Sequence, residues 1–419
     1  MENSLFKNSE LGLIPFNWNE YSVEKLIELE YIHKPLDGNH GSIHPKGKDF
    51  IDCGIPFIMA SDINNGKVNL KHCSFISEEQ ANSLQKGFSI EGDVLLTHKA
   101  TLGRTAIVPK ISTDFIMLTP QVTYYRIKNN DYLNNKYLKY YFDSPSFQGI
   151  LENHGSSGST RAYIGITAQR ELPIIIPPLP EQKAIASVLS SLDDKIDLLH
   201  QQNQTLEALA ETLYLNFIGE REFNSKLSNI FSLQNGYAFK SKSFKESGTI
   251  RVIKIKNISG DIVDITNSDF VDDESIKKLD TKFKINSGDI LIAMTGAEVG
   301  KLGIVPETEQ SLWLNQRVGL LKEKFEGAKY LAYLHLKSDF GQDYIENTAT
   351  GSAQPNISGE GIENCEFPFY EETELREICN KLSPLYDKVI FNLGQIQTLT
   401  KLRDTLLPKL MSGEVRVQL

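Results

Sequence analysis

The chain has 419 residues, of which 40% are hydrophobic and 23% are charged, and its formal net charge is −10. This length and composition are typical of an ordinary soluble protein that buries a sizeable core in two to four domains. No apolar run approaches the roughly 20 residues that cross a bilayer, and the first residues, MENSLFKNSELG, lack the basic and apolar regions of a signal peptide. The sequence therefore excludes a membrane protein and predicts a cytoplasmic location.

The net negative charge argues against a polyanionic partner, because phosphate contacts need lysine and arginine. The charge is unevenly distributed, however. Residues 240–256 hold five Lys and one Arg against one Glu, and residues 94–113 hold Lys99, Arg104 and Lys110 with no acidic side chain. Basic loops on an acidic body are compatible with this pattern, although solvated surface lysines explain any single run about equally well.

Residues 1–179 alternate short β-rich runs with turns. The runs IPFIMA, DVLLT, TAIVP and QVTYYRI are separated by Gly, Pro, Asn and Asp. This texture predicts a mixed domain that contains sheets.

Residues 180–219 follow the proline-rich break IPPLPEQ and are predicted to form a long helix. Their apolar positions alternate steps of four and three, which is the a/d seam of a heptad repeat. The seam consists of Ile185, Leu189, Leu192, Ile196, Leu199, Leu206, Ala210, Leu213 and Phe217.

The second half of the chain repeats the first. Residues 192–213 match residues 385–406 without a gap, GDVLL at Gly92 matches GDILI at Gly288, and GRTAIVP matches GKLGIVP. We therefore predict a second mixed domain over residues 220–370 and a second helix over residues 371–419. A period near 195 residues is too long for a solenoid and indicates two copies of one domain plus one helix.

The two helices are expected to pair antiparallel, with paired residue numbers that sum to 595. In that register Ile185 meets Leu410, and the only polar breaks in the two seams, Asn203 and Asn392, meet each other; Leu192 against Arg403 is awkward. A buried Asn pair satisfies its own amides and fixes the register at some cost in stability. The alternative is that each Asn is a tolerated defect.

A search for catalytic and metal-binding motifs finds none. The chain lacks a Walker A loop, a GxSxG elbow, an HExxH motif and the N/D-P-P-[FYW] element of an amino-methyltransferase. The four cysteines form no CxxC pair, which argues against a disulfide framework or a zinc ribbon, and free thiols fit a reducing compartment. The His and Cys residues of the first half match no standard ligand spacing. We predict no catalytic residue and no metal site.

Three kinds of polar, glycine-containing loop occur at matching positions of both halves. They begin at Leu36 and Asn235, at Thr97 and Met294, and at Gly155 and Ala349; in addition, Gln121 in TPQV is aligned with Gln316 in LNQR. Their side chains are of the types that contact phosphates and base edges in DNA. The candidate DNA-binding residues are Asn39, His40, Lys46, Lys48, Lys99, Thr101, Arg104, Gln121, Ser157, Ser159, Thr160, Arg161, Tyr237, Lys240, Lys242, Lys254, Lys301, Gln316, Arg317, Ser352, Gln354 and Asn356.

Several motifs make the chain resemble a specificity subunit of a type I restriction-modification system. They are GLIPFNWNEYSVEKL, GIPFIMASDI, GDVLLTHKATLGRTAIV, GSTRAYIG, PIIIPPLPEQKAIASVLSSLDDKID and LLPKLMSGEVRV, and together they cover nearly the whole chain. The proline-EQ-helix element is the most specific of them. The second helix departs from it, reading FPFYEETELREI.

The resemblance implies an α+β fold in which two similar mixed α/β target-recognition domains, each reading half of a bipartite DNA site, are separated by two long helices that form an antiparallel coiled coil with a pseudo-twofold internal repeat. It also implies double-stranded DNA, two methyltransferase subunits and motor-endonuclease subunits as partners. S-adenosylmethionine, ATP and Mg²⁺ are expected on those partners, with no cofactor bound by this chain and no catalysis by it.

Alternative functions remain open at the level of sequence. The chain could be the recognition subunit of a type IIB-like restriction system, which neighbouring genes would reveal. A two-headed protein-binding scaffold on a coiled coil is the alternative from another class, and salt-sensitive binding of duplex DNA would separate it from a DNA reader. A hidden enzyme is the weakest alternative.

Overall fold

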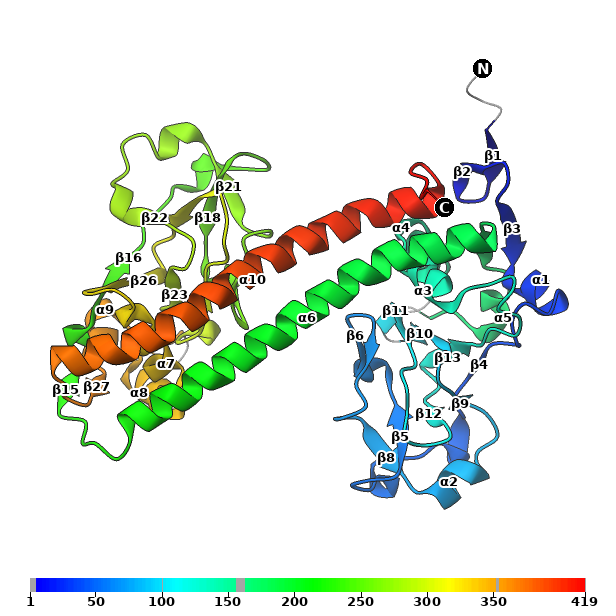
Figure 1. Ribbon diagram of the computed structural model, residues 1–419, viewed down its shortest axis with the longest axis horizontal. Coiled ribbons are helices and arrows are strands. Elements are labelled where there is room, and N and C mark those ends of the chain that lie inside the picture. Colours follow the sequence, from blue (N-terminus) through cyan, green and yellow to red (C-terminus); the bar gives the residue numbers. More distant parts are fainter. Residues whose placement is uncertain (1–4, 100, 156–162, 352–353, 419) are drawn as a thin grey trace. The chain divides into compact units, whose positions relative to one another are not determined.

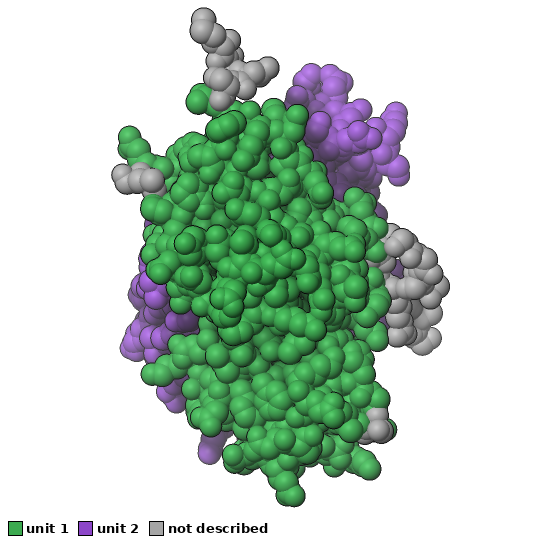
Figure 2. Space-filling model, turned by 90° about the vertical axis from the view of Figure 1, so that its right-hand side faces the viewer, with its two compact units in different colours: residues 1–194, 400–419 green, residues 195–399 purple. Residues whose placement is uncertain are grey.

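The computed structural model describes residues 5–99, 101–155, 163–351 and 354–418. The chain divides into two compact units, which Figure 2 distinguishes by colour. Unit 1 comprises residues 1–194 and 400–419, and unit 2 comprises residues 195–399.

Two long helices contribute to both units. They are α6 (Leu179–Ile218) and α10 (Glu372–Ser412), and in each unit their segments run side by side (Figure 1). The segments predicted as separate spacers are thus part of the compact units. None of the helices in the described ranges combines the length and the apolar character that a bilayer-spanning segment needs.

Unit 1 is built mainly of short strands. Its strands are β1 (Phe6–Ser9), β2 (Gly12–Pro15), β3 (Asn19–Ser22), β4 (Leu36–Asp37), β5 (Ile55–Ile58), β6 (Ile63–Asn64), β7 (Lys67–Val68), β8 (Ser74–Ile76), β9 (Phe88–Ser89), β10 (Val94–Lys99), β11 (Thr101–Ile107), β12 (Ile116–Leu118), β13 (Val122–Tyr125) and β14 (Pro173–Ile176). Its shorter helices are α1 (Val23–Glu28), α2 (Glu78–Ser83), α3 (Asn135–Asp143), α4 (Pro145–Gly155) and α5 (Ile166–Gln169).

The strands of unit 1 form two four-stranded sheets, ordered β11-β10-β13-β4 and β8-β5-β12-β9. The central strand β10 is apolar on both faces because the first sheet is covered on both sides; Leu95 packs with one core cluster, and Val94 and Leu96 with another. Helix α3 begins where the side chain of Asn134 accepts a hydrogen bond from the Tyr137 amide, which caps its first turn. The strand-rich domain predicted for the first half is confirmed.

Unit 2 has the same kinds of element. Its strands are β15 (Ser225–Lys226), β16 (Phe231–Asn235), β17 (Phe244–Lys245), β18 (Ile250–Ile253), β19 (Ile258–Ser259), β20 (Asp261–Val263), β21 (Asp269–Val271), β22 (Lys284–Ile285), β23 (Ile290–Ala293), β24 (Leu302–Ile304), β25 (Ser311–Leu314), β26 (Val318–Glu323) and β27 (Glu366–Phe367). Its shorter helices are α7 (Ala328–Lys337), α8 (Asp339–Thr348) and α9 (Gly359–Glu363).

The internal repeat is visible in the strand pairing. In unit 1, β5 pairs parallel with β12, and β10 pairs antiparallel with β11 and β13. In unit 2, β18 pairs parallel with β25, and β23 pairs antiparallel with β24 and β26. The sheets of unit 2 are larger, with the orders β16-β26-β23-β24-β20-β19 and β17-β21-β18-β25-β22.

In unit 2 the paired helix segments bury the two Asn residues of the seams. The Asn392 Nδ2 donates to Asn203 Oδ1 and to Gln202 Oε1, each at 2.8 Å. The expected contact is therefore present, but it satisfies the two amides only in part, because Asn203 Nδ2 and Asn392 Oδ1 are buried and have no hydrogen-bond partner among the described residues. The neighbouring turn is apolar, with Leu199 and Ile396 in one cluster.

In unit 1 the pairing follows the same register. Ile185 and Leu410 lie in one core cluster. Arg403, expected to fit poorly against Leu192, forms an ion pair instead: its Nη1 donates to Asp193 Oδ1 at 3.0 Å. The guanidinium therefore sits beside the seam and is paired with a carboxylate of the facing helix.

The first turn of each long helix makes an ion pair with the segment that follows the other long helix. In unit 1, Arg416 Nη2 and the Trp18 indole both donate to Glu181 Oε2, each at 2.9 Å. In unit 2, Arg221 Nη2 donates to Glu374 Oε1 at 2.8 Å, and its guanidinium lies 4.3 Å from the centre of the Tyr370 ring. The segment after α10 is thus bonded to the start of α6, and the segment after α6 is bonded to the start of α10.

Replacing both Asn residues by Leu is expected to leave unit 2 at least as stable as the parent. The single change Asn392→Leu should cost about 1 to 3 kcal/mol, because it removes the one partner of the buried Asn203 amide. Asn203→Leu with Asn392→Leu removes all four polar groups together and adds apolar contact. Urea unfolding followed by Trp313 fluorescence in a Trp18→Phe background reports unit 2 alone, since these are the only two tryptophans. A double variant less stable than the parent would contradict this.

Acidification is expected to weaken unit 2 through His335. This side chain is fully buried, its Nδ1 is 2.8 Å from the Tyr214 hydroxyl and its Nε2 is 2.8 Å from the Glu366 carbonyl oxygen, and burial lowers its pKa to about 4. A folded-state pKa below the ordinary value gives stability that is complete above about pH 6.5 and is lost as the pH falls toward 4. The loss should reach about 2 kcal/mol at pH 5.

The same Trp313 fluorescence measurement at pH 7 and pH 5 tests this expectation. The matched control is His335→Gln, which lacks the titrating ring. If the control loses as much stability on acidification as the parent, His335 is not the source of the pH dependence.

Candidate nucleic-acid interface

The loops of unit 1 surround a groove of about 450 Å³ beside the ends of β10 and β12. Four of the predicted residues lie together in its wall, namely His40, Lys46, Lys99 and Gln121. The other lining residues are Gly41, His44, Pro45, Gly47, Phe50, Phe57, Met59, Thr119 and Pro120. The lining of the groove thus combines apolar side chains with cationic and amide groups, a combination that suits contacts to bases and phosphates.

Backbone hydrogen bonds hold the loops of this surface together. The His98 amide donates to the Gln121 carbonyl at 2.9 Å, and the Ile164 amide donates to the His98 carbonyl at 3.1 Å. Lys99 forms an isolated antiparallel bridge with Tyr163. Three segments that are distant in sequence are therefore fixed side by side, and each presents its side chains from a rigid backbone.

A buried carboxylate supports the rim of the groove. Asp37 accepts a hydrogen bond from Lys86, and its Oδ2 lies 2.9 Å from His40 Nε2. Burial alone would raise the pKa of Asp37, but the bonds from Lys86 and His40 outweigh it and lower that pKa. Asp37 thereby positions His40, which lines the groove, together with Lys86 outside the lining. Among the described residues Lys99 has no carboxylate partner, and its Nζ lies 5.7 Å from the centre of the Tyr163 ring.

Unit 2 assembles an equivalent surface. The Met294 amide donates to the Arg317 carbonyl at 3.1 Å, and the Ile357 amide donates to the Met294 carbonyl at 3.0 Å. Thr295 bridges to Asn356, and Tyr237 bridges to Asn315. This surface brings together Tyr237, Gln316, Arg317, Gln354 and Asn356, all of them exposed.

The hydrogen bonds correct one alignment made from the sequence. The Val122 amide donates to the Thr119 carbonyl, and the Val318 amide donates to the Asn315 carbonyl. Gln121 precedes the first of these valines as Arg317 precedes the second. Gln121 therefore corresponds to Arg317 and not to Gln316, whose counterpart is Pro120. The sequence alignment was displaced because the two loops share a Gln at adjacent, non-equivalent positions.

Two predicted contact residues have structural roles. Asn39 is only 3% exposed and uses its side chain to accept from the Gln85 amide and donate to the Lys86 carbonyl. Arg104 Nη1 donates to Asn64 Oδ1 at 2.7 Å and to the Ile63 carbonyl at 3.2 Å. We therefore no longer propose Asn39 as a DNA contact, and the Arg104 guanidinium is hydrogen-bonded to β6.

Two predicted lysines of unit 2 are neutralised within the chain. Lys254 Nζ lies 2.6 Å from Asp269 Oδ2, and Lys301 is paired with Glu298. A DNA phosphate would have to compete with these carboxylates. The other predicted basic residues, Lys48, Lys240 and Lys242, are exposed, and Thr101 begins β11.

The predicted residues Ser157, Ser159, Thr160, Arg161 and Ser352 lie outside the described residues. Tyr163 is the first described residue after the first four of these in the sequence, and sequence reasoning missed it. It is 47% exposed, occupies the position equivalent to Asn356, and presents its ring beside Lys99. The available signal was its place at the end of the GSTRAY loop, because an exposed aromatic next to a basic side chain is a common nucleic-acid contact.

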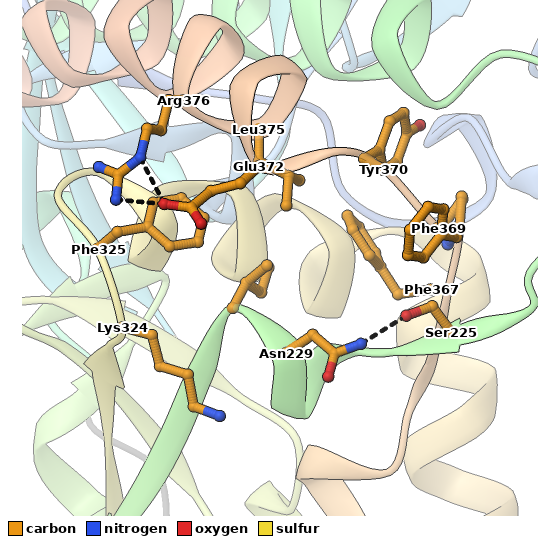
Figure 3. A pocket seen from close by; sticks show the side chains of 12 residues that line it. Ser225, Asn229, Lys324, Phe325, Phe367, Phe369, Tyr370, Glu372, Leu375 and Arg376 are labelled. Atoms are coloured by element: carbon orange, nitrogen blue, oxygen red, sulfur yellow. Dashed lines mark hydrogen bonds and ion pairs between the residues drawn. The ribbon is translucent and has the colours of Figure 1, made fainter.

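Unit 2 contains a groove of about 360 Å³ where α10 begins (Figure 3). Two cationic residues line it, Lys324 and Arg376, and the Arg376 guanidinium donates twice to Glu372 Oε1, at 2.8 and 2.5 Å. The Asn229 side chain donates to the Ser225 hydroxyl on its far wall (Figure 3). We do not include this groove in the candidate interface, because none of the predicted DNA-binding residues is among its lining residues.

Comparison with known proteins gives a consistent family. A family model described as "Type I restriction modification DNA specificity domain" matches residues 17–208 and 221–401. The type I restriction enzyme MjaIX specificity subunit of Methanocaldococcus jannaschii is 26% identical over 445 residues, with 99% of this chain and 97% of the relative covered. The HindI specificity subunit of Haemophilus influenzae is 22% identical, with 86% and 94% covered.

A solved structure supports the fold. The crystal structure of a type I restriction-modification S subunit from M. genitalium matches with a TM-score of 0.61 at 18% identity, covering 94% of this chain and 96% of that chain. The α+β fold with two mixed domains and paired long helices, predicted above, is confirmed.

Proposed function

The chain belongs to the family of type I restriction-modification DNA specificity domains, of which it carries two copies, and we propose that each unit reads one half of a bipartite duplex DNA target. The chain is the specificity subunit of such a system. The observation that carries the two-reader proposal is the pair of loop surfaces, built on equivalent backbone hydrogen bonds and furnished with different side chains.

The chemistry of the two surfaces fits duplex DNA. Lys46 and Lys99 in unit 1, and Arg317 in unit 2, have no carboxylate partner among the described residues, so each can contact a phosphate or a base without breaking an ion pair. The side-chain amides of Gln121 and Gln354 each offer a donor and an acceptor. Adenine presents the matching acceptor and donor in the major groove.

We assign catalysis to partner subunits. In the proposed complex, two methyltransferase subunits bind S-adenosylmethionine and methylate adenine, while endonuclease subunits with motor activity use ATP and Mg²⁺. This chain contributes recognition and assembly and holds no cofactor. A DNA-reading role places the complex in the cytoplasm beside the chromosome. Purified chain with S-adenosylmethionine and DNA should give no methyl transfer, and robust transfer would overturn the assignment.

Methylation mapping tests the proposal. DNA from cells that carry the whole operon should contain one bipartite methylated motif, and deletion of this chain alone should abolish it while the methyltransferase is still made. The reconstituted complex should bind duplex DNA with an affinity that falls steeply with salt, because bound phosphates release counterions. A motif that survives the deletion, or binding insensitive to salt, would favour the protein-binding scaffold instead.

A further inference from the structure

We infer that residues 121 and 317 are equivalent specificity determinants, with Gln121 selecting adenine in the half-site read by unit 1 and Arg317 selecting guanine in the half-site read by unit 2. This inference rests on the proposed function and deepens it. It assigns one base of each half-site to one side chain and states which two positions of the chain correspond.

The equivalence rests on three matched backbone contacts. The carbonyls of Gln121 and Arg317 accept from the amides of His98 and Met294 at 2.9 and 3.1 Å. Two positions before each determinant, the carbonyl of Thr119 or Asn315 accepts from the amide of the valine that follows the determinant, at 3.1 and 2.9 Å. That same residue, Thr119 or Asn315, donates its own amide to the last residue of the parallel partner strand, Ile58 or Ile253, at 3.0 and 3.1 Å.

The two turns are therefore pinned on both sides. The valine after each determinant is fully buried at the start of β13 or β26, so the backbone of residues 121 and 317 has little freedom. A long side chain on such a turn is presented from a fixed Cα toward the loop surface. Pre-organisation of this kind lets a hydrogen bond to a base discriminate strongly, because little conformational entropy is lost on binding.

Both side chains are uncommitted. Gln121 lies in the wall of the unit 1 groove, and Arg317 is exposed; neither side chain makes a hydrogen bond or ion pair with the described residues. This separates them from Asn39, Arg104, Lys254 and Lys301, which are held by neighbours. A free bidentate group at the same pinned position of each unit is the arrangement expected of a base reader.

The chemistry of the two groups differs in a defined way. Arginine forms two hydrogen bonds to the O6 and N7 acceptors of guanine, whereas glutamine donates to N7 and accepts from the N6 amino group of adenine. A neighbouring position differs as well. The residue that bridges to the third loop is Lys99 in unit 1 and Thr295 in unit 2. The two half-sites should therefore differ at the base pair that faces this turn, although the turns themselves superpose in their hydrogen bonding.

The test uses the full chain in complex with its methyltransferase subunits, in three variants. Arg317→Gln should change one G·C pair of the second half-site to A·T in the methylated motif and leave the first half unchanged. Gln121→Arg should change one A·T pair of the first half-site to G·C. Arg376→Gln is the matched control, since this arginine is exposed in the same unit but paired with Glu372, and the motif should be unchanged.

Binding to the mapped duplex and to its single-pair substitutions gives a second measurement for any variant that no longer methylates. The parent should prefer its own base pair by roughly 5- to 150-fold, and the variant should lose or reverse that preference at one position. Arg317→Lys, which keeps the charge but not the fork, should keep overall affinity and lose most of the discrimination.

The outcomes separate this inference from the proposed function. If the parent directs a bipartite motif and both variants bind and methylate that same motif, residues 121 and 317 are not determinants although the chain is still a reader. If Arg317→Gln alters the first half-site, the assignment of units to half-sites is wrong. If the parent directs no motif, the proposed function itself fails.

Discussion

A chimera that takes unit 1, residues 1–194 and 400–419, from another member of the family is expected to methylate a target with a new first half and an unchanged second half. Each unit has its own sheets and its own core cluster, and each carries its own loop surface. The readers should therefore be exchangeable as modules. The effect is complete, since every base contact of one half-site is replaced at once.

The structure decides where the chimera must be cut. Trp18 is fully buried and donates to Glu181, which also binds Arg416, and Leu410 and Met411 lie in the same core cluster. Exchanging residues 1–179 alone would place a foreign Trp18 region against the native end of α10. Losing such core contacts typically costs several kcal/mol. Including residues 400–419 keeps these contacts within one parent.

Methylation mapping of the chimera with the native methyltransferase measures the outcome. The control is the chimera limited to residues 1–179, which should assemble less well but should not acquire a third specificity. A change in both half-sites would refute modular reading.

The long-range pattern of the chain could be predicted from sequence, because heptad spacing and internal repetition are carried by many residues. The pairing of Asn203 with Asn392 follows from two apolar seams that are each interrupted once. The ion pair between Arg403 and Asp193 did not follow, because a residue beside the seam can reach its partner only once the crossing of the helices is known. The two unpaired polar atoms of the Asn pair likewise depend on side-chain orientation.

The sequence predicted which loops form the candidate interface, but not which residues of those loops face it. His40, Lys46, Lys99 and Gln121 do converge on one groove. Asn39, one residue before His40, points inward and is bonded to the backbone near Lys86. Loop composition cannot distinguish these neighbours, since the same polar side chain serves a turn or a ligand depending on tertiary contacts.

Lengthening both long helices by four residues is expected to lengthen the non-specific spacer of the DNA target by about two base pairs. Four residues add roughly 6 Å of helical rise, and base pairs of B-DNA are about 3.4 Å apart. If α6 and α10 set the separation of the readers, the half-sites stay unchanged while the spacer grows. If they merely tether two flexible heads, the parent should already accept several spacers.

The insertions belong after Asp194 in α6 and after Thr400 in α10. These points face each other in the register in which paired numbers sum to 595, and each lies within one residue of a boundary between the two compact units. An insertion nearer to the end of α6 would instead shift Ala210, Tyr214 and Ile218, which are buried in the core of unit 2. Four residues are close to one turn of 3.6, so the apolar seam of each helix stays on nearly the same face.

Insertion of two residues at the same points is the matched control. Two residues turn the following seam by about 200°, which should expose its apolar face, break the pairing and abolish methylation. The measurement is the methylated motif directed by each variant with its methyltransferase partner. A four-residue variant that keeps the parental spacer would mean that the helices do not set the distance, and altered half-site bases would mean that the readers depend on the helices for their specificity.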